Sequence, residues 1–189
     1  VTDNSSFPYL IYNCYNNGDF YDGVCPPNAG DISCWNTAGI TNMNYAFEFC
    51  YLYDYEFKCF EGPLECWNVG QVTTMYAMFK KSYFNQPIDS WDVSQVKDMG
   101  GMFYRAEYFN QPLDTWDVSQ VKDMARMFED AFSFNQPLGN WNVSQVKNMF
   151  AMFEDAVDFN QPIDSWNVSK VKNMACLLYT SDAADELSR

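Results

Sequence analysis

A phrase of 15 residues returns at a fixed interval along this chain. It reads NQPIDSWDVSQVKDM from Asn85 to Met99 and recurs with few changes at 110–124, 135–149 and 160–174. Tryptophans stand at 35, 67, 91, 116, 141 and 166, so the last four are spaced by 25 residues. A period of this length indicates stacked structural repeats, each of which buries its apolar side chains only against its neighbours.

Apolar residues follow two different patterns within each unit. The first part, I-x-x-W-x-V at 88–93, alternates at its end and predicts a short strand with Trp91 pointing inward. The second part, 96–106, has apolar residues at steps of three and four, which predicts a short helix with one buried face. Ser94 precedes this helix as a candidate N-cap.

The tetrapeptide Phe-Asn-Gln-Pro closes each full unit, at 84–87, 109–112, 134–137 and 159–162. Proline blocks the continuation of a helix and biases the residue before it towards extended geometry. We expect the Asn and Gln side chains, which recur at fixed places, to hydrogen-bond backbone groups of the next unit in the stack.

The complete unit, W-[DN]-V-S-x-V-K-[DN]-M-x-x-M-F-x-x-A-x-x-F-N-Q-P-[IL], resembles the repeat of BspA-type leucine-rich-repeat surface proteins. The resemblance covers about residues 34–175, although the first copies depart from it, with FEGPL at 60–64 in place of FNQPL. It implies an α/β solenoid that is leucine-rich-repeat-like, with short parallel strands on one face and short helices on the other. It also implies a role in adhesion or ligand binding at a bacterial or protist cell surface, and it brings no catalytic residues.

Two segments fall outside the repeats. Residues 1–33 are rich in Cys, Tyr and Asn and are predicted to form a flank or cap, because the open end of a stack exposes apolar surface. Residues 176–189 (CLLYTSDAADELSR) break the pattern in mid-unit, and their beginning reads as the in-frame translation of a transposase-type sequencing-library adapter. We therefore predict a truncated repeat region, 34–175, followed by a tail that is not native.

Six of the seven cysteines fall within the first 66 residues, and the seventh, Cys176, belongs to the tail. This clustering predicts disulfides and an oxidising, extracytoplasmic setting, with buried free thiols as the alternative. One candidate pair precedes two equivalent tryptophans, a second brackets an inserted loop, and a third is left over, although six cysteines allow 15 pairings. The candidate pairs are Cys34 with Cys66, Cys50 with Cys59 and Cys14 with Cys25.

Charge and composition exclude several classes of function. The formal net charge of −14 would repel nucleic acid and anionic membranes. The chain has no histidine, which removes Ser-His-Asp and Cys-His catalysis and the usual zinc and haem ligand. No apolar run reaches the roughly 18–20 residues of a membrane span. We therefore expect no nucleic-acid partner, no cofactor, no metal and no transmembrane segment in this part of the protein.

Small polar side chains flank the Trp and Val of each unit and would form columns on the predicted sheet face. In leucine-rich repeats this face commonly binds partners, so it is a candidate docking surface for a protein or a glycan. Alternatively, Asp and Asn only cap turns while Ser satisfies backbone groups. Stacked Asp92 and Asp117 could attract Ca²⁺, but no calcium-binding loop motif accompanies them. The candidate residues are Ser90, Asp92, Ser94, Thr115, Asp117, Ser119, Asn140, Asn142, Ser144, Ser165, Asn167 and Ser169.

Repetition without a unique polar cluster favours a non-enzymatic, secreted or cell-surface module for adhesion or for protein or glycan binding. One alternative is a structural spacer that carries another domain. Another is a carboxylate-based glycoside hydrolase, which needs one singular pair of acids in a cleft. The outer positions of the predicted helices vary in a way that fits a solvated face; they are Lys80-Lys81, Tyr104-Arg105, Glu129-Asp130 and Glu154-Asp155.

Overall fold

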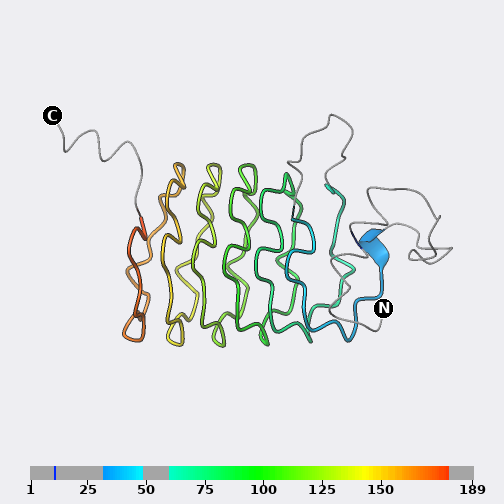
Figure 1. Ribbon diagram of the computed structural model, residues 1–189, viewed down its shortest axis with the longest axis horizontal. Helices are drawn as coiled ribbons and strands as arrows, with labels where there is room; N and C mark the ends of the chain where they lie inside the picture. Colours follow the sequence, from blue (N-terminus) through cyan, green and yellow to red (C-terminus); the bar gives the residue numbers. More distant parts are fainter. Residues whose placement is uncertain (1–10, 12–31, 49–59, 179–189) are drawn as a thin grey trace.

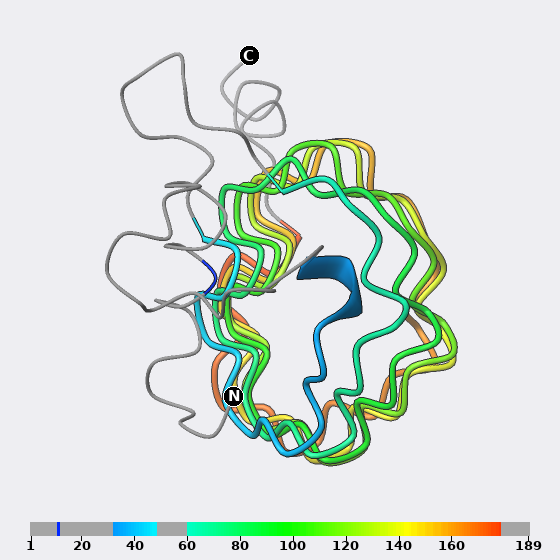
Figure 2. The ribbon, with the colours of Figure 1, turned by 90° about the vertical axis from the view of Figure 1, so that its right-hand side faces the viewer.

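The computed structural model describes residues 11, 32–48 and 60–178. In this part of the chain, successive repeat units form rungs that stand side by side along one axis (Figure 1). Figure 2 looks along that axis and shows the rungs superposed around a common interior. A 3₁₀ helix, η2 (Ile32–Cys34), precedes the first rung. Single parallel bridges join neighbouring rungs, at Asn42–Thr74, Thr74–Asp98, Asp98–Asp123, Asp123–Asn148 and Asn148–Asn173.

The interior of the stack contains the apolar side chains that recur in every unit. Trp91, Val96 and Met99 are buried, and so are their counterparts in the following rung. Phenylalanine rings continue from rung to rung: Phe103 and Phe128 stack with ring centroids 5.5 Å apart and an interplanar angle of 6°. The prediction of which side chains point inward is therefore confirmed, and an isolated rung would leave these groups exposed.

The predicted α/β solenoid of parallel strands and short helices is wrong. The rungs described at 32–48 and 60–178 contain no α-helix, and their only β pairing is the single bridge between neighbours. Residues 96–106, predicted as helix, form consecutive turns, in which the Met102 N–H donates to the Met99 carbonyl at 3.2 Å. Every second amide instead donates a hydrogen bond to a carbonyl of the next rung. The Gly101 N–H, for example, donates to the Ala125 carbonyl at 2.8 Å. These amides are then not available for the i→i−4 bonds of an α-helix.

Residues with left-handed backbone conformation produce this course of the chain. Each of four consecutive rungs has two residues with positive φ, four positions apart: Ala77 and Lys81, Gly101 and Arg105, Arg126 and Asp130, Ala151 and Asp155. A non-glycine residue in this region costs about 1–2 kcal/mol. The compensation is visible between rungs: the backbones of 97–105 and 122–129 exchange five hydrogen bonds, donated by Met99, Gly101, Phe103, Arg105 and Lys122.

The segment predicted as a strand, 88–93, also turns. The Trp91 N–H donates to the Ile88 carbonyl at 3.1 Å, which closes a tight turn within the rung. Ser94 is not a helix N-cap, because no helix follows. Its own N–H donates to Asp92 Oδ1 at 3.1 Å, which is the geometry of an Asx turn.

Side-chain ladders complete the contacts between rungs. Asn110 Oδ1 accepts the Asn135 N–H at 3.0 Å and the Gln136 Nε2–H at 2.9 Å, and the same arrangement links the rungs before and after. The predicted role is therefore confirmed for Asn, whereas the Gln side chain bonds the backbone of the preceding rung: the Gln136 Nε2–H donates to the Asn110 carbonyl at 3.1 Å. The repeat tryptophan adds a second ladder that was not predicted, because the Trp116 Nε1–H donates to the carbonyl of Ile88, 3.0 Å away in the previous rung.

Several predictions concern residues outside the described ranges. Most of the flank 1–33 and the tail beyond residue 178 are among them, as are Cys14, Cys25, Cys50 and Cys59. Cys66 is exposed, but the side chain of Cys34 is not described. The division of the chain into flank, repeats and tail and the disulfide pairs therefore stay predictions.

Candidate functional site

The twelve side chains of the predicted docking face are exposed or half-exposed. In each rung the Asp or Asn side chain accepts the N–H of the serine two residues later, as between Asp92 and Ser94 at 3.1 Å. Hydrogen bonds from the Ser94 side chain and backbone lower the pKa of Asp92. The Thr115 hydroxyl donates to the Asp89 carbonyl of the preceding rung at 2.8 Å. These contacts give the columns structural partners, and partner binding at this face stays a prediction.

A different surface shows where the rungs are not alike. The residue two positions after each bridge residue is Tyr76, Gly100, Ala125 and Phe150 in four successive rungs. Of these four residues, Tyr76 and Ala125 line a hollow in the surface, whereas Gly100 is buried and Phe150 is not part of the lining. The fit around Gly100 is close: a Cβ at that position would lie 3.1 Å from the Tyr76 ring.

We call this hollow the lateral groove. Its volume is about 320 Å³, within the range of about 300–1,000 Å³ that is usual for small-molecule sites. Its lining residues belong to four successive rungs, which stand about 4.8 Å apart. Its lining combines small, aromatic and charged residues, namely Tyr76, Ala77, Lys80, Asp98, Gly101, Tyr104, Asp123, Ala125, Arg126 and Asn148.

Three consecutive bridge residues supply polar groups to the groove. Asp98 Oδ1 accepts the Gly100 N–H at 2.9 Å, and Asp123 Oδ1 accepts the Ala125 N–H of its own rung at the same distance. Asn148 Nδ2 donates to Asp123 Oδ2 at 3.0 Å. Burial, together with the charge of Asp123, raises the pKa of Asp98, although the Gly100 N–H opposes the shift. The groove therefore contains two neighbouring carboxylates, one of which is held in an unfavourable environment.

Two cationic side chains, Lys80 and Arg126, line the same groove. Each forms an ion pair with a glutamate that lies outside the lining. Lys80 Nζ lies 2.7 Å from Glu48 Oε1, and Arg126 Nη1 lies 2.9 Å from Glu129 Oε1. Burial opposes the charge of Lys80, but the hydrogen bond and charge of Glu48 outweigh it and raise the pKa of the lysine. Lys80 also lies 5.9 Å from the centre of the Tyr104 ring. The groove therefore presents hydrogen-bond donors as well as acceptors.

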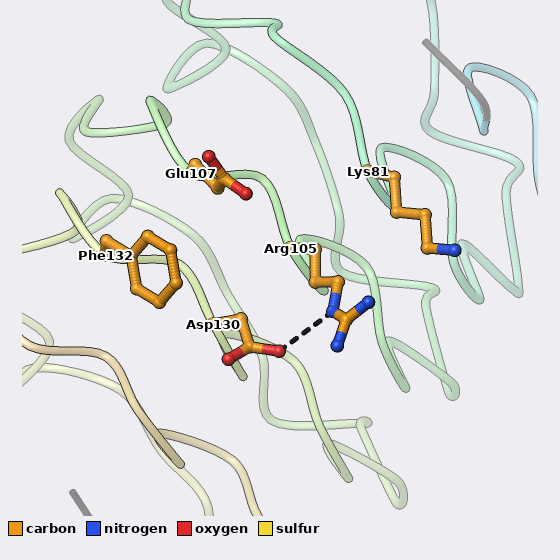
Figure 3. A pocket seen from close by; sticks show the side chains of 5 residues that line it. All are labelled: Lys81, Arg105, Glu107, Asp130 and Phe132. Carbon is orange, nitrogen blue, oxygen red and sulfur yellow. Dashed lines mark hydrogen bonds and ion pairs between the residues drawn. The ribbon is translucent and has the colours of Figure 1, made fainter. Parts of the chain in front are cut away.

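A second hollow, the loop pocket, has a volume of about 300 Å³ and is lined by Lys81, Arg105, Glu107, Asp130 and Phe132. Figure 3 shows the Arg105 side chain between Lys81 and the Phe132 ring, with its Nε 3.0 Å from Asp130 Oδ2. The aromatic ring is 40% exposed. Arg105 and Asp130 therefore pair with each other within this pocket, and Lys81 and Glu107 also line it.

Sequence reasoning assigned five of these positions to a solvated helix face, namely Lys80, Lys81, Tyr104, Arg105 and Asp130. Lys80, Tyr104 and Arg105 vary between repeats, and variation alone does not distinguish a solvated surface from a site. The signal that was available is the series Tyr-Gly-Ala-Phe at 76, 100, 125 and 150, because a small residue between large ones at one repeat position indicates a hollow. Asp98 and Asp123 could be seen as a repeated pair of acids, but their place in a groove depends on the turns of the rung.

The described residues form neither a cluster of metal ligands nor a membrane-spanning helix. In the ranges 32–48 and 60–178, no three His, Cys, Asp or Glu side chains gather closely enough to hold a metal ion. No helix in the described part of the chain has the length and hydropathy needed to span a bilayer.

Comparison with known proteins gives one family. No curated protein and no solved structure matched the chain. The model of the family described as "Mycoplasma protein of unknown function, DUF285" matches residues 20–131 and, in a second overlapping match, 81–188. Overlap of two matches is what a chain of near-identical repeats produces, and together they cover well over half of the sequence. The chain therefore belongs to the DUF285 family.

Proposed function

We propose that this chain is a non-enzymatic binding module of a secreted or surface-exposed protein, and that it holds its partner in the lateral groove. The observation that carries the proposal is the hollow of about 320 Å³ in which the small residues Ala77, Gly101 and Ala125 lie beside Tyr76 and Tyr104. The scaffold does not require a small residue at 125, because Tyr76 and Phe150 occupy the equivalent positions of other rungs in the same stack. The core and ladder residues thus recur in each rung, whereas the residues that line the groove differ between rungs.

The extracytoplasmic setting rests on sequence. Six cysteines cluster in the first 66 residues, and the repeats resemble those of surface proteins. The net charge of −14 favours solubility and disfavours anionic partners. Protein and glycan ligands both remain compatible with this setting.

One observation favours a second candidate function, a retaining glycoside hydrolase. Asp98 and Asp123 belong to adjacent rungs, lie in one groove, and differ in environment, with burial raising the pKa of Asp98. Retaining glycosidases use two carboxyl groups about 5–5.5 Å apart, one of them with a raised pKa. Against this reading, each Oδ1 already accepts a backbone N–H in an Asx turn.

The test is a binding screen with a parallel assay for turnover. The purified chain is immobilised and exposed to arrays of host glycans and to a panel of extracellular proteins. Saturable binding without change in the bound ligand is the expected result. Uniform failure to bind would favour a spacer, and release of new reducing ends from a glycan would favour the hydrolase.

A further inference from the structure

We propose that the lateral groove binds one neutral sugar ring of a glycan. This inference rests on the proposed binding function, and it names the class of ligand. It draws on the size of the groove, the signs of the charges that line it, and the aromatic rings at its edge.

The size of the groove suits a small unit better than a protein surface. The hollow has a volume of about 320 Å³, at the lower end of the about 300–1,000 Å³ that is usual for small-molecule sites. Gly101 and Ala77 are among its lining residues and carry little or no side chain, which leaves room for a sugar ring beside the backbone. A pyranose that is one residue of a longer glycan fits a hollow that is open to solvent.

The mixture of charges selects against ions. An anionic ligand would meet the neighbouring carboxylates of Asp98 and Asp123, and a cationic one would meet Lys80 and Arg126. A neutral polyhydroxylated ligand avoids both penalties, because each hydroxyl can donate and accept. Its hydroxyls can donate to the carboxylates and accept from the ammonium, guanidinium and Asn148 amide groups. Hydrogen bonds with charged groups are stronger than those between neutral groups.

The polar groups of the groove are also spaced regularly. Asp98, Asp123 and Asn148 occupy the same position in three successive rungs and are therefore about 4.8 Å apart along the stack. The Oδ1 atom of each residue accepts a hydrogen bond from the backbone N–H two residues later. The distance is 2.9 Å for Asp98 and Asp123 and 3.2 Å for Asn148. Because these acceptors are fixed before binding, little side-chain entropy is lost when a ligand is bound.

Two tyrosines provide the apolar contact that the ring carbons of a sugar need. Tyr76 is 39% exposed and Tyr104 is half-buried, and both line the groove. Tyr76 is held by an edge-to-face contact with Tyr45, with ring centroids 5.4 Å apart. A tyrosine presents an apolar face with a polar tip, which suits a ligand with C–H groups on one face and hydroxyls around its edge.

The experiment compares three variants of the chain by calorimetry and on a neutral-glycan array that carries lactose, N-acetyllactosamine, cellobiose and chitobiose. Ala125→Phe fills the groove with the residue that Phe150 places at the equivalent position of the next rung, so folding should be retained. Asp123→Asn removes one carboxylate but keeps the Oδ1 acceptor, as Asn148 does. Ala175→Phe is the control: it introduces the same Ala-to-Phe substitution as Ala125→Phe, at the equivalent and exposed position of a rung outside the groove.

We expect the unchanged chain to bind at least one of these sugars. Ala125→Phe should abolish that binding and Asp123→Asn should weaken it at least about tenfold, the effect of losing a hydrogen bond to a charged group. Ala175→Phe should bind as the unchanged chain does. Sugar binding that survives Ala125→Phe would overturn the inference and leave the binding function in place.

The remaining outcomes separate the two proposals. Binding of extracellular proteins without binding of any arrayed sugar would also overturn the inference and retain the binding function. Binding of neither class would overturn both. Hydrolysis of an arrayed disaccharide that is lost in Asp123→Asn would support the groove as a sugar site and overturn the non-enzymatic function.

Discussion

Gly101 and Ala151 occupy the same place in their rungs and share a left-handed backbone, with φ of 59° and 54°. The hydrogen bonds to the next rung impose that conformation, and it does not restrict these positions to glycine. Lysine, arginine and aspartate also adopt it in this chain, as Lys81, Arg126 and Asp130 do. The sequence therefore carries little local sign of these turns, because glycine, their usual marker, is found at only one of the eight paired positions.

Gly101→Ala is expected to lower the free energy of unfolding by about 1 kcal/mol, since alanine is strained at positive φ. Space does not limit the change, because the nearest atom to a new Cβ is 3.7 Å away. Gly139→Ala is the matched control: its φ is not positive and a new Cβ would make ordinary contacts at 3.5 and 3.8 Å. Chemical denaturation of both variants measures the difference, and equal stabilities would contradict the strain.

Asp98→Asn is expected to stabilise the fold at neutral pH. The carboxyl has its pKa raised above its ordinary value of 3.8 by burial and by Asp123. The folded state therefore holds this proton more tightly, and the free energy of unfolding falls as the pH rises from the unfolded towards the folded pKa. Asparagine removes that loss and keeps the acceptor for the Gly100 N–H, as Asn148 does for Phe150.

The measurement is urea denaturation at pH 3 and at pH 7. We expect the variant and the unchanged chain to have similar stabilities at pH 3, where Asp98 is protonated in both folded and unfolded chains. At pH 7 the variant should be the more stable of the two. A variant that is less stable at pH 7 would show that the carboxylate is favourable where it lies. A destabilising carboxylate in a groove is consistent with retention for binding.

A whole rung was predicted correctly in its contents and wrongly in its backbone. The inward residues and the Asn-Gln ladder follow from spacing, because burial requires the same residue types at the same interval. Helix and strand do not follow: apolar steps of three and four at 96–106 arise from a run of tight turns as well as from a helix. The choice between them depends on amides such as that of Gly101, which reaches the Ala125 carbonyl in the next rung. Local periodicity does not contain that information.

Asn110→Ala is expected to lower the free energy of unfolding by about 1–3 kcal/mol. The change removes the acceptor of the Asn135 N–H and the Gln136 amide. Asn160→Ala is the control, because no described residue donates to the Asn160 side chain. Thermal and chemical unfolding of the two variants measure the effect, and similar losses in both would contradict the role of the ladder.

The stack as a whole behaves as a one-dimensional array, because each rung contacts mainly its neighbours. Deleting residues 110–134 removes one full period and joins Phe109 to Asn135, which restores the repeat register. We expect this shortened chain to unfold cooperatively at a lower temperature and to lose sugar binding, since Asp123 and Ala125 are gone. Deleting 110–121 removes about half a rung and should abolish cooperative unfolding in calorimetry. A cooperative transition in the second deletion would contradict the requirement that rungs stack in whole periods.

The ladders also bear on how such a protein can change over time. Near-identical units favour unequal crossing-over, which adds or removes whole periods and so shifts a hollow along the stack in steps of about 4.8 Å. Within one period, replacing a single partly exposed residue, such as Ala125, opens or closes a hollow without changing the core. We expect related chains to keep the same core and ladder residues and to differ in these partly exposed residues. Sequencing this repeat region from many isolates would reveal whether diversity concentrates at positions 76, 100, 125 and 150.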